Sequence, residues 1–191
     1  MSSVEDKLPY LKFRNKLLNF AEGKKRGIRN PFVIVPVEPK YERLLGEKLK
    51  GWAKKTDKNV YVYDLDELLV KTTVFKIIMN ISSEVVQKKE IEDTLKDNLG
   101  KEIVSEIKEE IKGVSNKSDN IILLLNLGSL YPFTRASELL DEFDRVNINT
   151  TIGIPFPGEV IGGKLSFFGV DARLYYPAHR IEQQIEGGHL Q

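Results

Sequence analysis

The chain has 191 residues, of which 41% are hydrophobic and 30% are charged, and its formal net charge is +1. These values are typical of one soluble globular domain with room for a sizeable core. The lack of cysteine excludes a disulfide framework and a thiol nucleophile, and it fits a reducing cytoplasm. The longest apolar run, residues 121–125, is too short to span a bilayer, and the first residues do not resemble a signal peptide.

The charges are unevenly distributed along the chain. Residues 1–60 carry fifteen Lys and Arg against seven Asp and Glu, a net charge of +8, whereas residues 84–145 carry nine against fourteen, a net charge of −5. Such a split indicates solvated helix faces, a charged protein interface or a nucleic-acid face. The basic part lacks the interleaved aromatics of a single-strand binder and any helix-turn-helix or finger signature, so solvated helix faces are the favoured interpretation.

The first third of the chain predicts a helix followed by a buried strand. Residues 4–22 have an irregular but mainly helical apolar spacing, and residues 23–31 form a glycine-rich break that ends in Asn-Pro. Residues 32–37 are continuously apolar, as strands of a parallel sheet tend to be, with Pro36 near the end of the strand.

A second helix and strand follow. Pro39 or Lys40 opens the helix, and residues 60–63 form the strand. The apolar face of this helix consists of Tyr41, Leu44, Leu45, Leu49 and Trp52. Asp64 and Asp66 come directly after the strand, where they could cap a helix that runs to about residue 80 or hold a metal or a ribose hydroxyl; capping is favoured.

The remaining elements complete the alternation of helices and strands. Residues 84–113 predict one helix or two, because Gly100 interrupts them, and residues 134–143 predict a short helix. The strands are expected at residues 121–125, 149–154 and 164–168, the last of them at an edge of the sheet.

This order predicts an α/β fold, with right-handed crossovers and a mainly parallel sheet of four to five strands flanked by helices. The sheet is Rossmann-like or degenerate P-loop-like. We expect residues 1–30 to form an N-terminal helical arm, residues 31–181 the α/β domain, and residues 182–191 a C-terminal tail.

One segment matches a phosphate-binding loop in all but its last position. Gly158-Glu-Val-Ile-Gly-Gly-Lys-Leu165 has the pattern G-x-x-x-x-G-K, but Leu165 stands where a hydroxyl holds magnesium. The loop should also open a helix, whereas the residues after it predict a strand. A structural turn is therefore favoured over nucleotide binding.

The polar side chains that follow the strands do not form a recognised catalytic set. Gly128-Ser-Leu-Tyr-Pro is not a nucleophile elbow, and His179 and His189, the only histidines, have no partner at ligand spacing. Arg135 lies in the first turn of a predicted helix, where the dipole disfavours a cation. We expect it to pair with an acidic side chain of this chain, with Glu159 as the best candidate, or with an acidic group of a ligand.

Several separated motifs resemble the BrxB family of bacteriophage-exclusion (BREX) defence systems. They are Gly128-Ser-Leu-Tyr-Pro-Phe-Thr-Arg135, Pro157-Gly-Glu159, Leu165-Ser-Phe-Phe-Gly169 and Tyr175-Tyr176. The resemblance covers about residues 120–181, and Pro177 and His179 depart from the family pattern. It implies cytoplasmic phage defence alongside a methyltransferase, a large ATPase and the phosphatase-fold protein PglZ. It also implies an accessory, partner-binding subunit.

The sequence therefore predicts a non-catalytic interaction subunit of a BREX system, with PglZ as its expected partner and with no cofactor, metal or membrane. The alternatives are a nucleotide or small-phosphate binder and, third, a DNA-contacting accessory protein. The candidate partner-binding or loop-anchoring residues are Tyr131, Phe133, Arg135, Phe156, Glu159, Tyr175, Tyr176, His179 and Arg180. We expect the aromatic members of this set to cluster as one exposed patch.

Overall fold

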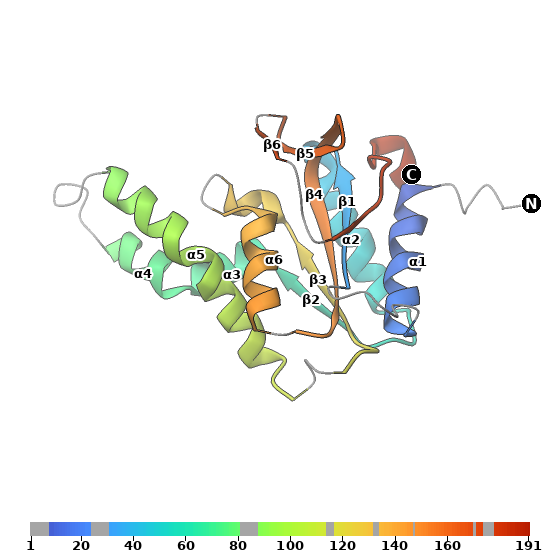
Figure 1. Ribbon diagram of the computed structural model, residues 1–191, viewed down its shortest axis with the longest axis horizontal. Helices are drawn as coiled ribbons and strands as arrows, with labels where there is room; N and C mark the ends of the chain where they lie inside the picture. Colours follow the sequence, from blue (N-terminus) through green and yellow to red (C-terminus); the bar gives the residue numbers. More distant parts are fainter. Residues whose placement is uncertain are drawn as a thin grey trace, which may run out of the picture.

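The computed structural model describes residues 8–23, 31–80, 88–113, 117–131, 134–146, 148–169, 171–173 and 178–191. Helices and strands alternate along these residues (Figure 1). The helices are α1 (Pro9–Ala21), α2 (Glu42–Ala53), α3 (Leu65–Lys71), α4 (Thr73–Asn80), α5 (Lys88–Glu110) and α6 (Ala136–Arg145), with short 3-10 turns η2 (Pro39–Tyr41), η3 (Leu127–Leu130) and η4 (Gly187–Leu190). The strands are β1 (Phe32–Val37), β2 (Val60–Asp64), β3 (Ile121–Leu125), β4 (Thr151–Ile161), β5 (Lys164–Phe167), β6 (Asp171–Arg173) and β7 (His179–Arg180).

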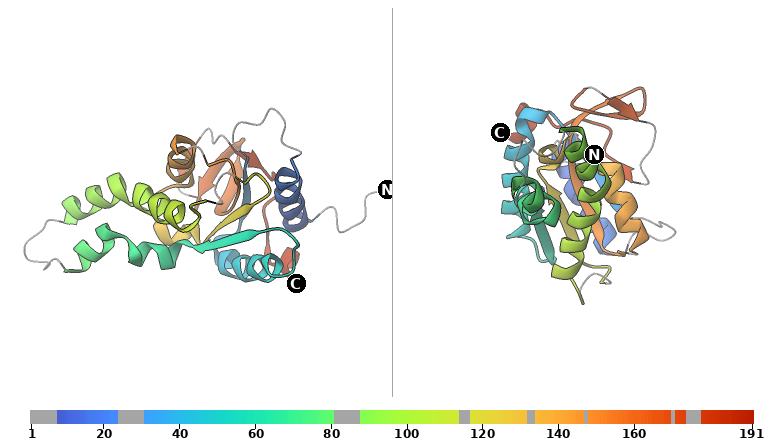
Figure 2. Two further views of the ribbon diagram at one scale, coloured as in Figure 1. Left: turned by 90° about the horizontal axis from the view of Figure 1, so that it is seen from below. Right: turned by 90° about the vertical axis from the view of Figure 1, so that its left-hand side faces the viewer.

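The sheet is mainly parallel, which confirms the predicted fold class. Its strand order is β2-β3-β4-β1-β7, and every pair along this path is parallel. Strands β5 and β6 extend the far end of β4 as an antiparallel hairpin and a third strand. Every residue of β1 and β3 is buried, because helices cover both faces of the sheet and leave no solvent-facing side for a polar residue (Figure 2).

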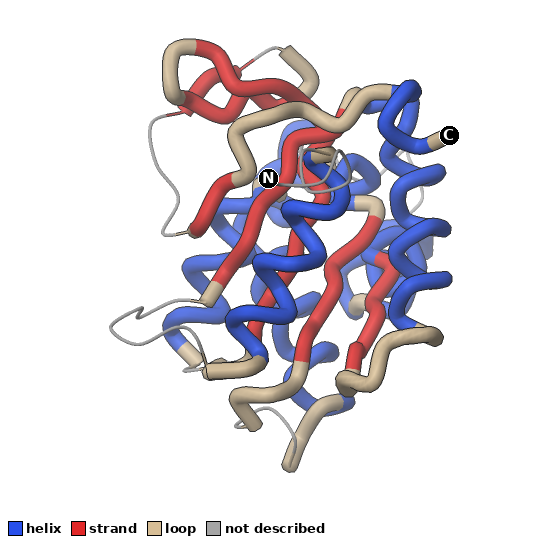
Figure 3. Tube along the Cα trace, turned by 90° about the vertical axis from the view of Figure 1, so that its right-hand side faces the viewer, coloured by secondary structure: helices blue, strands red, loops and turns tan. Residues whose placement is uncertain are grey.

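The two faces of the sheet carry separate cores. Helices α1 and α2 cover one face (Figure 3). On this face, Leu17, Leu45 and Leu49 pack on Val33 and Leu123. Helices α3, α5 and α6 cover the other face. The apolar stripe predicted along residues 84–113 supplies that second core, and it belongs to one continuous helix, α5, in spite of Gly100.

The two ends of the chain differ from the predicted arm and tail. Phe13 and Leu17 of α1 are fully buried against the sheet, so this helix is a layer of the fold. At the other end, the N–H of Ile185 donates to the carbonyl of Pro36, and the N–H of Glu38 donates to the carbonyl of Ile185. Residues 179–185 thus extend the sheet beyond β1, because its edge offers unpaired backbone groups that the C-terminal segment satisfies.

Strand β4 is longer than predicted and passes through two prolines. Its pairing with β3 ends at Gly153, whereas its pairing with β1 continues to Pro157. Pro155 and Pro157 therefore lie where β4 has one parallel neighbour, so the N–H groups that proline lacks leave little of the ladder unpaired. Beyond them, β4 continues into the hairpin with β5 and carries the chain past the edge of the sheet.

Candidate functional site

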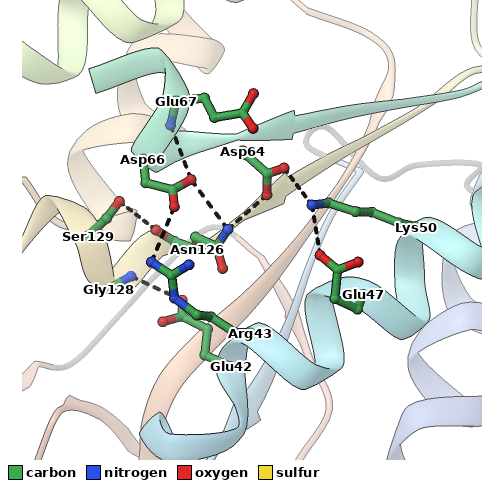
Figure 4. Close-up of polar contacts among 10 residues, drawn as sticks. All are labelled: Glu42, Arg43, Glu47, Lys50, Asp64, Asp66, Glu67, Asn126, Gly128 and Ser129. Atoms are coloured by element: carbon green, nitrogen blue, oxygen red, sulfur yellow. Dashed lines mark hydrogen bonds and ion pairs between the residues drawn. The ribbon is translucent and has the colours of Figure 1, made fainter. Parts of the chain in front are cut away.

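A polar network joins the ends of β2 and β3 to α2 (Figure 4). Asn126 follows β3 directly and has a left-handed backbone with φ 58°, a conformation that Asn tolerates better than most residues. Its Nδ2 donates to Oδ1 of Asp64 at 2.8 Å and to Oδ1 of Asp66 at 3.3 Å. The amide thus connects two neighbouring strands at their carboxyl ends, where ligands of α/β proteins commonly bind.

Cations from α2 complete this network. Lys50 Nζ lies 2.7 Å from Asp64 Oδ2 and 2.9 Å from Glu47 Oε1. The hydrogen bond to Asp64, and after it the one to Glu47, raises the pKa of Lys50. Arg43 lies 3.4 Å from Asp66 Oδ2. Helix α3 begins after Asp64, but the predicted capping by its side chain is wrong, because the carboxylate bonds Asn126 and Lys50 instead. Asp66 Oδ1 accepts the N–H of Glu67.

Glu42 is the buried acid of the site. Its side chain accepts the backbone N–H of Gly128 at 3.0 Å, and the residue is only 8% exposed. Burial raises the pKa of Glu42, while the N–H groups of Gly128 and Leu127 oppose the shift. A raised carboxyl pKa occurs at catalytic sites, but here the carboxylate holds the start of η3 against the start of α2. Its physical role is to anchor the loop after β3.

Four aromatic side chains form a cluster that we call the aromatic group: Tyr131, Phe156, Phe167 and Phe168. They come from this anchored loop, from β4 and from the end of β5. Tyr131 contacts Phe167 and Phe168, with ring centroids 5.3 and 5.2 Å apart, and Phe167 contacts Phe156. Tyr131 and Phe168 are 38% and 37% exposed. The expected exposure of Phe156 is wrong, because this ring is fully buried in the core below them. Phe133, Tyr175 and Tyr176 lie outside the described residues.

Phe168 has an unusual backbone for an aromatic residue. Its φ is +50°, in the left-handed region that costs a bulky side chain about 1 kcal/mol or more. The ring is held between Tyr131 and Phe167, and a Cβ on Gly128 would lie 3.0 Å from its Cζ and 2.6 Å from Glu42 Oε2. The packing around Gly128 therefore fixes Phe168 in a strained position in which the residue stays partly exposed.

The predicted loop anchors have different positions. Arg135 is the half-buried N-cap of α6, one residue before the predicted place in its first turn, and its backbone N–H donates to Glu138 Oε2 at 3.0 Å. Glu159 is exposed on β4, opposite Ser166 of β5. The pairing of Arg135 with Glu159 stays a prediction.

Arg180 connects the C-terminal segment to the hairpin of β4 and β5. Its NH1 donates to the carbonyl of Gly163 at 2.8 Å, and its other nitrogens hold Glu182. The neighbouring His179 packs edge-on against the ring of Phe20, with centroids 4.8 Å apart. Burial and then the nearby Lys16 lower the pKa of His179. Both residues therefore hold the C-terminal segment beside β1 and α1.

The segment that resembles a phosphate-binding loop is this hairpin. Gly162 and Gly163, with φ 54° and 78°, form its two-residue turn, which matches the twist of the flanking strands. Gly158 packs so closely that a Cβ would lie 2.0 Å from the carbonyl oxygen of Ser166. The glycines thus satisfy the requirements of a hairpin, and the segment opens a strand instead of a phosphate-binding helix.

Sequence reasoning missed Glu42 and Lys50, which reach the site from α2. Neither directly follows a predicted strand, so only the position of α2 over the sheet brings them there. The sequence did indicate Asn126 as a possible site residue, because it directly follows a predicted buried strand. Among the described residues, no three His, Cys, Asp or Glu side chains form a group that could hold a metal ion, and no described helix could cross a membrane.

One comparison with known proteins finds a relationship. The family model for BREX protein BrxB matches residues 59–181, which include β2, α5, η3, the aromatic group and the hairpin. No curated protein and no solved structure matches the chain.

Proposed function

The chain belongs to the BrxB family of BREX phage-defence proteins, and we propose that it is a non-catalytic interaction subunit that binds the phosphatase-fold component PglZ. The binding surface consists of the exposed sides of Tyr131 and Phe168, together with the loops that carry them. We call it the aromatic surface. Its interaction with PglZ, its place in the cytoplasm and its lack of catalysis are all parts of this proposal.

The strained, half-exposed ring of Phe168 is the observation that carries the proposal. A strained conformation of this kind persists only where the surrounding structure enforces it, and such residues cluster at functional positions. The ring also lies beside Tyr131, a residue type that is enriched at the energetic centres of protein interfaces. An aromatic pair held rigid before binding loses little conformational entropy when a partner covers it.

The polar network supports binding over chemistry. Asp64 contacts Lys50 at 2.7 Å and Asn126 at 2.8 Å, and Asp66 contacts Arg43 at 3.4 Å. Glu42 accepts a backbone N–H. Groups already engaged in internal hydrogen bonds must break them before they transfer a proton or hold a ligand. The network therefore serves to support η3, which precedes Tyr131 in the chain.

Co-expression with the other proteins of the BREX system, followed by affinity purification, tests the proposal. We expect PglZ to co-purify with the wild-type chain and to be lost with Tyr131→Ala and Phe168→Gly, each by about tenfold or more in affinity. Phe168→Gly removes the ring but keeps a residue suited to the left-handed backbone, so its fold should persist. Phage-plating assays with the same variants should show a parallel loss of protection.

Met79→Ala is the matched control, because Met79 is a large apolar residue that is 69% exposed on α4, away from the aromatic group. It should retain PglZ. Retention of PglZ by both aromatic variants would contradict the proposed surface, and capture of a different BREX protein in place of PglZ would contradict the proposed partner.

A further inference from the structure

The face of the molecule formed by α1 and α2 carries a cavity of about 330 Å³ that lies outside the family match. Six residues line it: Tyr10, Arg14, Lys48, Gly51, Trp52 and Lys55. The hydroxyl of Tyr10 donates to the backbone carbonyl of Lys48 at 3.4 Å, which connects the two helices across the cavity. The cavity therefore has fixed walls on both sides.

Arg14 occupies an unusual position in this cavity. Its guanidinium carbon lies 5.3 Å from the centre of the Tyr10 ring and 5.2 Å from the centre of the Trp52 ring. Its Nε is buried and has no hydrogen-bond partner. Two rings attract the cation, but they do not accept its N–H groups as an oxygen would. A buried donor of this kind requires an explanation, and an anion bound in the cavity would supply the acceptor.

The other charged side chains that line the cavity are also cationic. Lys48 and Lys55 join Arg14, and no Asp or Glu lines the cavity. In the described part of the chain, no ion pair is formed by any of these three cations. The nearby Glu47 bonds Lys50 at 2.9 Å instead. Three positive charges around one small volume repel one another, and an anion between them would offset that repulsion.

We propose that this cavity binds a small phosphomonoester, with the phosphate on Arg14, Lys48 and Lys55 and the organic part beside Tyr10, the half-buried aromatic residue of the lining. The planar fork of arginine suits bidentate contact with a phosphate, and lysines add point charges to it. A phosphate dianion balances three cations better than a single carboxylate does. The volume, near the lower end of the range for ligand sites, fits a compact molecule.

The geometry favours a small ligand over a nucleic acid. Single-stranded nucleic acid binds by stacking its bases on accessible aromatic faces. Trp52 is only 6% exposed, so its ring cannot receive a base in that way. The ligand is instead a molecule that enters the cavity itself.

Tryptophan fluorescence provides a direct test, because Trp52 is the single tryptophan of the chain and lines the cavity. The probes are phenyl phosphate, inorganic phosphate, benzoate and sodium chloride at matched ionic strength. Phenyl phosphate should change the emission saturably, inorganic phosphate more weakly, and benzoate and chloride only at far higher concentration. Arg14→Gln and Lys48→Gln should each weaken phenyl phosphate binding by about tenfold or more.

Lys12→Gln is the matched control, because Lys12 is an exposed cation of the same helix that does not line the cavity. It should bind phenyl phosphate like the wild type, and circular dichroism should show that all three variants are folded. Arg14→Gln could unfold α1, because the guanidinium packs on the rings of Tyr10 and Trp52. In that case Lys48→Gln still tests the proposal.

Absence of a saturable response, or an equal response in the wild type and both cavity variants, would overturn the proposal. A response to a 5′-phosphorylated single-stranded oligonucleotide without one to phenyl phosphate would replace it with a nucleic-acid site. Tighter binding of benzoate than of phenyl phosphate would replace it with a carboxylate site. Because none of the cavity residues belongs to the aromatic surface, PglZ binding is a separate measurement that none of these outcomes decides.

Discussion

Replacing Glu42 with alanine tests whether a buried carboxylate supports the loop that carries the aromatic surface. The change removes the acceptor for the N–H of Gly128, which lies 3.0 Å from Glu42 Oε1. A hydrogen bond to a charged group contributes about 1.5–3 kcal/mol, and part of this is offset because the variant no longer buries a carboxylate. We therefore expect Glu42→Ala to lower the free energy of unfolding by about 2 kcal/mol.

For a chain of this length, such a loss lowers the melting temperature by about 4–8 °C. Differential scanning calorimetry at neutral pH measures it. Glu42→Gln is the matched control, because its side-chain oxygen can still accept the N–H of Gly128 without the cost of burying a charge. It should melt closer to the wild type than Glu42→Ala does.

The pH dependence of stability provides a second readout for Glu42. Burial raises its pKa above the ordinary 4.5, so the native state holds a proton more tightly than the unfolded chain. Stability should therefore fall as pH rises from 4.5 through the native pKa. Glu42→Gln should flatten the curve in this window. An alanine variant as stable as the wild type, or a glutamine variant with an unchanged pH curve, would refute the reasoning.

Four further predictions follow from individual contacts. Gly158→Ala should destabilise the hairpin by about 3 kcal/mol or more in chemical denaturation, because its Cβ would overlap a backbone oxygen; a stable variant would contradict the close approach. Lys164→Ala should leave the fluorescence response to phenyl phosphate unchanged, and a lost response would place phosphate on the hairpin. The lowered pKa of His179 means that stability falls as pH drops through 6.5, so thermal melts of His179→Gln should lose this acid dependence. A double-mutant cycle of Arg135→Ala with Glu159→Ala should show a stabilising coupling in denaturation, and strict additivity would exclude the expected pair.

Much of the fold follows from local sequence patterns. The apolar runs at residues 32–37 and 121–125 become β1 and β3 with those same limits, because a run buried on both sides has to be apolar throughout. The stripe between residues 84 and 113 becomes the buried side of α5, since its period matches the turn of a helix. The hairpin at Gly162 and Gly163 follows from the turn conformation that paired glycines favour.

The tertiary structure alone decides which polar side chains meet. Asp64 and Asn126 lie 62 residues apart in the sequence, and Glu42 and Gly128 lie 86 apart, so no local pattern relates them. They come together because parallel strands end at one edge of the sheet and α2 lies over that edge. The burial of Phe156 and the packing of both chain ends were also beyond local reasoning. An apolar residue just past the predicted end of a strand, or a helix beside a basic break, has no sequence signal that specifies which surface will cover it.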